Sequence, residues 1–147
     1  MLVGPDWRGN RAALEASARA LGIDERIVFT GGAFGPEKLS LVAGCDVFVH
    51  PSRWEAGVPF SVLEAAALSR ACLLAEGADP GAALVHAGAA VPTEPTATSI
   101  AEALLDIAGR SHDELIAMGR CARSVAERDF SWKRIASTIV DAYAEAA

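Results

Sequence analysis

The sequence predicts an α/β fold, a Rossmann-like parallel sheet flanked by helices on both faces. The runs "RIVFTGG" (residues 26–32) and "DVFVH" (46–50) are β-branched and aromatic, as strands are. "ACLLA" (71–75) is continuously apolar, which is typical of a strand covered on both faces. Helix patterns at 36–44 and 60–68 separate these three runs. Alternating strands and helices imply right-handed crossovers and therefore a parallel sheet.

The N-terminal segment predicts the end of a strand followed by a helix. Leu2 and Val3 form a short apolar segment before a turn, and Asn10 is the expected helix cap, with Gly22 as the stop. The apolar positions of this helix are spaced by four and three residues: Leu14, Ala18 and Leu21.

The second half predicts a short edge strand and then three helices. Residues 76–96 carry weaker patterns and are expected to form a loop, one helical turn and that strand. Two of the helices are expected to open with capping boxes, Ser99 with Glu102 and Ser111 with Glu114, and the third with Ser131 as its cap.

Composition restricts the class of protein. The chain has 147 residues, 52% of them hydrophobic, and a formal net charge of −6, so we expect one domain over 1–147. The acidic balance argues against nucleic acid or an anionic membrane as the main partner. Three cysteines without metal spacing are interpreted as reduced core thiols of a cytoplasmic protein. We see no apolar run long enough to span a bilayer and no signal peptide.

One loop, "HPSRWEAGVPF" (50–60), has the features of a ligand site. Ligands of open parallel sheets bind beyond the carboxyl ends of the strands, and this loop leaves the strand that ends at His50. Pro51 ends the strand, and Gly57 and Pro59 force a turn before the next helix. The free N–H groups of that helix's first turn form an anion site that needs no lysine.

Two glutamates flank this predicted anion site. Glu64, early in the helix, can accept hydrogen bonds from vicinal hydroxyls such as those of a ribose, and Glu55 can do so at the other end of the same ligand. This arrangement suits a nucleotide sugar. The alternative is that Glu64 is an ordinary first-turn helix glutamate and Glu55 a solvated loop residue.

The segment "GCDVFVHPSRWEAGVPFSVLEAAA" (44–67) resembles the signature of the group 1 (family 4) retaining glycosyltransferases of GT-B fold, in their C-terminal nucleotide-sugar-binding domain. The resemblance covers almost the whole chain, including "FSWKRIASTIVDAY" at its end. It implies one half of a GT-B fold and transfer of a hexose from a nucleoside diphosphate sugar to a hydroxyl acceptor. It also implies no cofactor and no obligatory metal.

The resemblance also implies roles for particular residues. Glu55 becomes the catalytic residue that contacts the donor sugar, and Glu64 holds the ribose. The amides for the diphosphate and sugar come from the intervening loop: Ala56, Gly57, Val58, Pro59, Phe60 and Ser61. The base is expected to pack near the turn after the second strand: Gly31, Gly32, Ala33 and Phe34.

The sequence departs from the family pattern at three places. Eight residues separate the two glutamates, one more than is usual, and Ser69 and Ala71 stand where Gly and Pro are common. The family's preceding strand and helix, with the Arg and Lys that neutralise the diphosphate, are expected upstream of Met1, as is the N-terminal acceptor domain. We therefore expect catalysis only from a full-length hexosyltransferase, and self-association of this chain through uncovered apolar surface. The alternative is a non-catalytic nucleotide-sugar-binding or interaction module derived from the same fold.

Two other chemistries find little support in the sequence. His50, Ser52 and Asp46 are near in sequence but lack the G-x-S-x-G elbow of a hydrolase. His86 and His112 are isolated, so no metal site is expected.

Overall fold

The computed structural model describes residues 1–146 and divides the chain into two compact units. The first unit is Met1–Ser40, and the second begins at Leu41. Helix α2 (Gly35–Ala43) runs across the division. Each unit is described by itself below.

The first unit contains a two-stranded parallel sheet and one long helix. Strand β1 pairs with β2 through Leu2↔Phe29 and Val3↔Gly31, with an irregularity between the two pairs. The elements of this unit that precede α2 are β1 (Leu2–Val3), η1 (Trp7–Gly9), α1 (Asn10–Ala20), η2 (Asp24–Arg26) and β2 (Phe29–Gly31).

Helix α1 begins differently from the sequence prediction. Asn10 is its first residue and not its cap, because the preceding Gly9 adopts a left-handed conformation (φ 72°) and no side chain caps the helix there. The carboxylate of Asp6 accepts a hydrogen bond from the Arg11 N–H at 3.0 Å and so satisfies one first-turn amide from outside. The predicted stop is confirmed, since Gly22 has a φ of +66°.

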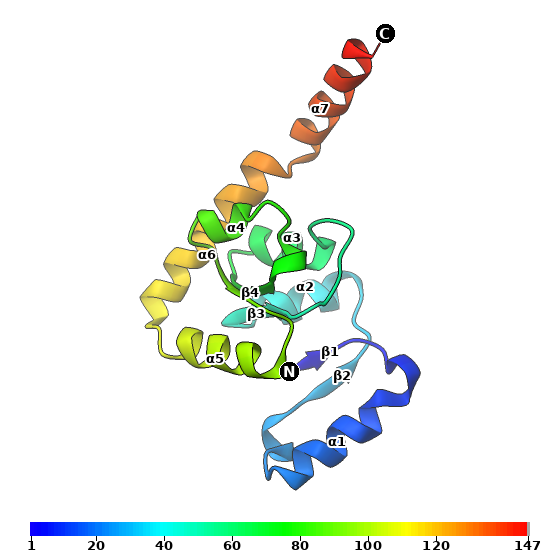
Figure 1. Ribbon diagram of the computed structural model, residues 1–147, viewed down its shortest axis with the longest axis vertical. Coiled ribbons are helices and arrows are strands. Elements are labelled where there is room, and N and C mark those ends of the chain that lie inside the picture. The colour runs from blue at the N-terminus through cyan, green and yellow to red at the C-terminus, as the bar shows by residue number, and fades with distance from the viewer. Residues whose placement is uncertain (147) are drawn as a thin grey trace. The chain divides into compact units, whose positions relative to one another are not determined.

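The second unit is a three-stranded parallel sheet covered by helices (Figure 1). The strand order is β3-β4-β5, so β5 lies at an edge, where the missing N–H of Pro92 costs no hydrogen bond within the sheet. Its elements are β3 (Val47–His50), α3 (Phe60–Ala67), β4 (Ala71–Ala75), η3 (Glu76–Ala78), α4 (Ala83–His86), β5 (Ala90–Thr93), α5 (Ala97–Ala108), α6 (His112–Asp129) and α7 (Trp132–Glu145).

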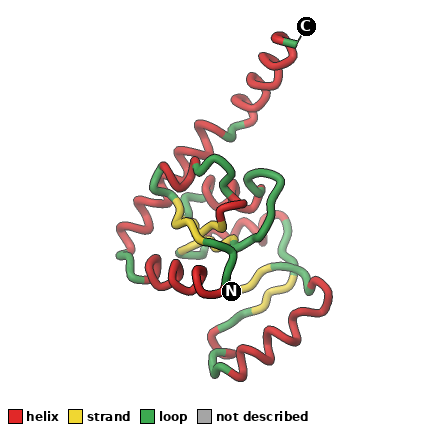
Figure 2. The backbone as a smooth tube through the Cα atoms, viewed as in Figure 1, coloured by secondary structure: helices red, strands yellow, loops and turns green. Residues whose placement is uncertain are grey.

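Strand β4 forms the centre of the core, as its apolar run predicts, and all five of its residues are buried. Its side chains alternate between two apolar clusters, one on each face of the sheet. Cys72 and Leu74 pack with α3, α4 and the second half of α6, whereas Leu73 packs with α5 and the start of α6. Figure 2 shows the short strands enclosed by helices. The predicted parallel sheet with helices on both faces is therefore present in this unit.

The ends of the later helices follow local hydrogen-bonding rules. Ser111 and Glu114 form the predicted capping box of α6: Ser111 Oγ accepts from the Glu114 N–H, and Glu114 Oε2 accepts from the Ser111 N–H at 2.7 Å. Ser131 caps α7 as predicted. The prediction for α5 is wrong, because Thr96 and not Ser99 is the cap, and Thr96 Oγ1 accepts from the Ser99 N–H.

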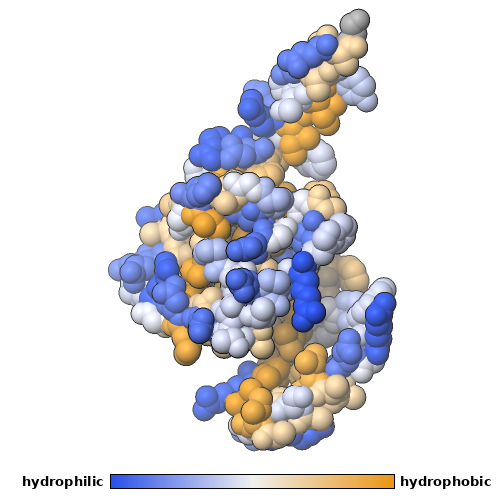
Figure 3. All heavy atoms as spheres, in the orientation of Figure 1, coloured by the Kyte–Doolittle hydropathy of each residue, from blue (hydrophilic) through white to orange (hydrophobic). Residues whose placement is uncertain are grey.

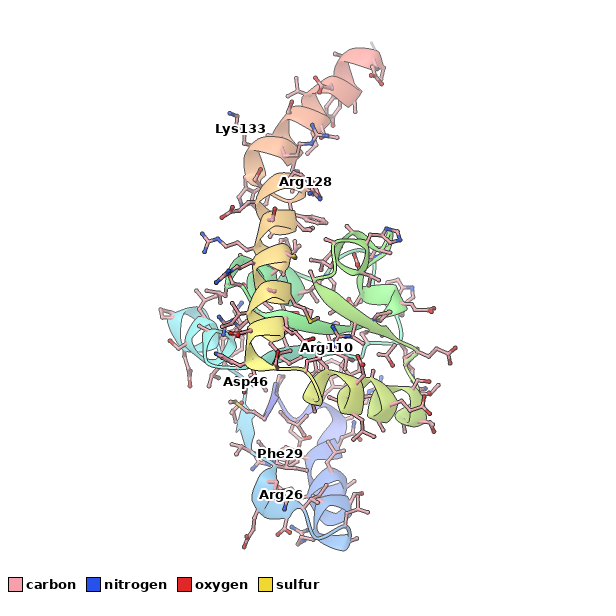
Figure 4. The ribbon with its side chains drawn as sticks, turned by 90° about the vertical axis from the view of Figure 1, so that its left-hand side faces the viewer. Arg26, Phe29, Asp46, Arg110, Arg128 and Lys133 are labelled. Carbon is pink, nitrogen blue, oxygen red and sulfur yellow. The ribbon has the colours of Figure 1, made fainter. Side chains whose placement is uncertain are left out.

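The turn between α5 and α6 is held by Arg110, which lies near the start of α6 in Figure 4. Its guanidinium donates to Asp106 Oδ2 at 2.8 Å and lies 3.3 Å from the Met118 sulfur. One side chain thus ties the end of α5 to the second turn of α6.

The end of α3 comes very close to α6. Ser69, which follows α3, has a φ of +58°, the left-handed conformation that a glycine would adopt without strain. Its carbonyl oxygen would lie 2.1 Å from a Cβ at Gly119 of α6. Gly119 is therefore required for the close approach of these two segments, whose contact the sequence does not reveal.

The three cysteines lie in different environments. Cys72 is buried, and burial raises the pKa of its thiol to about 12. Cys45 is half-buried, and burial also raises the pKa of its thiol. Cys121 is exposed on α6, so the prediction of a core position fails for this residue. No disulfide joins any of them.

The last helix, α7, has no buried residue. Trp132 and Tyr143, at its two ends, are both largely exposed, and Figure 3 shows hydrophobic side chains along this helix. Within residues 1–146, no helix is long and apolar enough to cross a membrane.

Candidate functional site

The candidate site begins where β3 ends. His50 is the last residue of β3, Pro51 interrupts the strand, and the loop continues to Pro59 before α3 begins at Phe60. Pro59 has an extended ψ of 143° and acts as the N-cap residue of α3. Its carbonyl accepts hydrogen bonds from the N–H groups of Val62 and Leu63, at 3.0 and 3.1 Å.

The first turn of α3 has no capping side chain. Proline cannot supply one, and no side chain bonds to the helix start at Pro59. No acidic residue lies in this turn either. The amides of Phe60 and Ser61 therefore meet no carboxylate from their own turn, and the helix dipole favours an anion at this position.

Glu55 is anchored to the end of β3 by its carboxylate. Its Oε1 lies 2.8 Å from His50 Nε2, and both side chains are about three-quarters covered. The hydrogen bond from His50 holds the pKa of the Glu55 carboxyl below its ordinary value of 4.5, and Ser52 adds a smaller effect in the same direction. Glu55 is thus a fixed, ionised hydrogen-bond acceptor rather than a solvated loop residue.

The loop that follows β4 lies against the loop that follows β3. Register pairs His50 with Leu74, so both strands end at the same edge of the sheet. A Cβ at Gly77 would lie 3.9 Å from the backbone of each residue of the segment 53–55. Gly77 is therefore part of the site, although sequence reasoning missed it. The signal was present as a glycine two residues after the end of a buried strand.

Two aromatic side chains border this loop. Trp54 is 77% exposed and Phe60 is 73% exposed, one on each side of the segment Ala56 to Pro59. Aromatic faces exposed to this extent can stack on a sugar ring or a base. Arg53, the one basic residue of the loop, is also exposed.

Glu64 lies in the second turn of α3 and is therefore not the first-turn glutamate of the alternative interpretation. It is the fifth residue of α3, so it belongs to the second turn and receives less stabilisation from the helix dipole than a first-turn residue. Its side chain is half-buried, and its Oε2 is buried. Glu64 and the segment Ala56 to Ser61 share one loop-and-helix unit with Glu55.

The other predicted site residues belong to the first unit. Gly31 ends β2 with a φ of +74°, and the residues after it lead into α2. A Cβ at Gly32 would come within 3.1 Å of the Phe34 ring, so this ring lies against the turn. Phe34 is 79% exposed and Ala33 is half-buried. The predicted base-binding segment is thus a glycine turn with an exposed aromatic ring.

The two acidic residues of the loop after β4 lie in different environments. Asp79 is buried, and its Oδ2 accepts hydrogen bonds from the N–H groups of Leu84 and Val85, at 2.9 and 3.1 Å. The Asp79 carboxylate thus binds the backbone amides at the start of α4. Glu76 is exposed at the start of η3. Among residues 1–146, no cluster of His, Cys, Asp or Glu could hold a metal ion.

The geometry defines a class of protein: a parallel α/β domain with an uncapped helix start and a carboxylate bound to the strand end, both at the carboxyl edge of its sheet. The profile of the family "Glycosyl transferases group 1" matches residues 1–110. The chain belongs to this family. The resemblance noted in the sequence is thereby confirmed.

Solved glycosyltransferases share the fold. Sucrose-phosphate synthase from Thermosynechococcus elongatus aligns with a TM-score of 0.79 at 20% identity, over 98% of this chain and 37% of that one. HepE of Anabaena, solved in complex with UDP and glucose, aligns with a TM-score of 0.80 at 20% identity, over 98% and 40%. WaaG, a glycosyltransferase involved in lipopolysaccharide biosynthesis, aligns with a TM-score of 0.66 at 23% identity, over 86% and 33%.

The chain thus spans about two-fifths of the length of the first two of these glycosyltransferases. The fold is that of a part of a GT-B enzyme. No curated protein matches the sequence.

Proposed function

We propose that this chain is the donor-binding, C-terminal domain of a retaining glycosyltransferase, and that it binds a nucleoside diphosphate sugar at the β3–α3 loop. The full enzyme transfers a hexose from this donor to a hydroxyl acceptor, without a metal ion or cofactor. The proposal depends most on one observation: an anchored, ionised Glu55 lies in the loop that leads into the uncapped first turn of α3.

The loop supplies the interactions that such a donor needs. The diphosphate lies at the amides of Phe60 and Ser61, where the helix dipole offsets its charge in an acidic chain. Glu55 accepts hydrogen bonds from sugar hydroxyls, because a carboxylate that already binds His50 keeps further acceptor lone pairs. HepE, which shares the fold, was solved with UDP-glucose.

Glu64 is proposed to hold the ribose hydroxyls. Its half-buried position limits this role, since a ligand must reach a carboxylate that has one oxygen covered by protein. The contribution of Glu64 is therefore the part of the proposal that mutation tests most directly.

The experiment is a calorimetric and thermal-shift screen of the chain with UDP, GDP and ADP and their glucose conjugates, each with and without EDTA. A ligand at about a hundred times its dissociation constant stabilises the fold by roughly 2.7 kcal/mol. We expect one base to bind, with no effect of EDTA. Binding that disappears with the chelator contradicts the metal-free part of the proposal.

Variants then assign the contacts. Glu64→Gln keeps the shape of the side chain and is expected to weaken the matching nucleotide about tenfold, as loss of a hydrogen bond to a charged group does. Glu102→Gln, at an exposed position of α5, is the matched control and leaves binding unchanged. If no nucleotide binds at millimolar concentration, the proposed donor site is wrong.

A further inference from the structure

A histidine outside the set of predicted contacts is attached to the loop's main carboxylate. His50 Nε2 and Glu55 Oε1 are 2.8 Å apart, and His50 precedes the loop on the last position of β3. Glu55, in contrast, lies within a loop that contains Gly57 and two prolines. The histidine thus connects a loop side chain to a strand that belongs to the core.

The histidine ring is itself held in place. It stacks on Phe48 with ring centroids 6.4 Å apart and planes 8° from parallel. Residues two apart on a strand share a face, and Phe48 packs against the apolar cluster that contains Cys72 and Leu74. A continuous series of contacts therefore runs from this cluster through Phe48 and His50 to the Glu55 carboxylate.

The ring nitrogen must donate in this pair, because the carboxylate is ionised and can only accept. A neutral ring with its proton on Nε2 satisfies this requirement, and so does a protonated ring. The bond uses one acceptor site of Oε1 and fixes the direction in which the remaining lone pairs of Glu55 point. For a group that must meet sugar hydroxyls, this direction decides whether hydrogen bonds form.

We infer that His50 is a positioning residue of the donor site: it orients Glu55 toward the sugar of the bound nucleotide and makes no contact with the nucleotide itself. The inference rests on the proposed function, and it adds that recognition of the sugar, but not of the nucleoside diphosphate, depends on His50. The relevant quantity is the sugar increment, defined as the dissociation constant of the nucleoside diphosphate divided by that of its glucose conjugate.

The test compares two substitutions at the same position. His50→Leu removes the donor and keeps an apolar side chain beside Phe48. His50→Gln replaces the ring by a shorter, flexible side chain whose amide can still donate. Dissociation constants are measured by calorimetry for UDP, GDP and ADP and for their glucose conjugates. His86→Leu, at an exposed position of α4, is the matched control.

We expect His50→Leu to lower the sugar increment about tenfold and to leave the affinity for the nucleoside diphosphate unchanged. His50→Gln recovers most of the increment, and His86→Leu retains all of it. In the Glu55→Gln background the two substitutions at position 50 have nearly the same increment, since the ionised acceptor they orient is gone.

Three other outcomes overturn the inference. If His50→Leu weakens the diphosphate and the conjugate by the same factor, His50 acts on general stability and not on Glu55. If both substitutions leave the increment intact, the pair is irrelevant to the sugar, while the donor site itself stands. If the unaltered chain binds neither diphosphates nor conjugates, the proposed function fails and the role of His50 fails with it.

Discussion

The two units of this chain bury very different amounts of apolar surface. In Met1–Ser40 one residue, Ala18, is buried, whereas in the second unit β4 alone buries five. Figure 3 shows hydrophobic side chains at the surface of the first unit, and Leu14 and Leu21 of α1 are exposed there. Both units contain amphipathic helices beside parallel strands. Secondary structure follows from the local spacing of apolar residues. Burial of those residues requires further helices or strands that pack against them.

The largest expected difference between the units comes from the same substitution made once in each. Leu73 has no exposed surface and lies at the centre of β4, whereas Leu14 of α1 is 49% exposed. Leu73→Ala leaves a cavity and is expected to cost about 2–5 kcal/mol of unfolding free energy. Leu14→Ala is expected to cost about 0.5 kcal/mol or less. Urea unfolding followed by circular dichroism measures both, and equal costs would contradict the comparison.

The next largest effect concerns the contact between α3 and α6. A Cβ at Gly119 would lie 2.1 Å from the Ser69 carbonyl oxygen, a backbone atom that cannot rotate away. Gly119→Ala is expected to destabilise the second unit by about 1–3 kcal/mol, or more. Gly109→Ala is the control, since its Cβ would meet backbone oxygens at 3.4 and 3.5 Å and its φ is −78°. A Gly119→Ala protein as stable as the Gly109→Ala protein would show that the two segments can separate.

A smaller effect depends on pH through the capping box of α6. Hydrogen bonds from Ser111 lower the pKa of the Glu114 carboxyl below its ordinary value of 4.5. A lowered pKa means that this stabilisation is complete above pH 4.5 and is lost as the pH falls through the lowered value. Glu114→Gln should therefore reduce stability at neutral pH and make little difference in acid.

Denaturant midpoints of both proteins, measured across that range, check the expectation. The control is the double variant Ser111→Ala/Glu114→Gln, compared with Ser111→Ala alone. Without the Ser111 hydroxyl the capping box is already incomplete, so adding Glu114→Gln should lower stability less than it does in the wild type. If the difference in denaturant midpoint between the wild type and Glu114→Gln were the same at all pH values, the Glu114 carboxylate would not be the source of this pH dependence.

The smallest expected effect is a gain in stability. Ser69 holds a left-handed conformation, which costs a non-glycine residue about 1–2 kcal/mol. Glycine removes this cost but adds about 0.4–1 kcal/mol of unfolded-state entropy, so Ser69→Gly is expected to stabilise by about 0.5–1 kcal/mol. Ser124→Gly, inside α6, should have the opposite sign. Calorimetric melting temperatures distinguish the two, and a loss at Ser69 would show that its side chain has a role.

The accuracy of the sequence predictions varied with the range of the interaction. The buried run 71–75 was predicted and observed as β4, because continuous apolar character reflects cover on both faces. The box at Ser111 was confirmed, since its partners are three residues apart. The box at Ser99 was wrong because Thr96 offers the same local chemistry one turn earlier, and pattern alone does not choose between the two.

The sequence predicted which loop forms the candidate site, but not how its side chains and the neighbouring loop are arranged. Two prolines and a glycine after a strand predict a turn at residues 50–60 whose free amides favour an anion. The two glutamates predict hydrogen-bond acceptors on either side of it. The bond between His50 and Glu55, and the position of Gly77 against their loop, were not predicted. They depend on the side chains and backbone of neighbouring loops, whose conformations are set by packing and not by periodicity.

The sequence by itself determined the order of strands and helices and the parallel arrangement that follows from their alternation. These features depend on hydrogen bonds and hydrophobic periodicity within a few residues. Only the tertiary structure decided which segments meet: Ser69 against Gly119, and Gly77 against the segment 53–55. Such contacts form because the packed core holds strand ends and helix ends at fixed distances, and that information is spread over the whole chain.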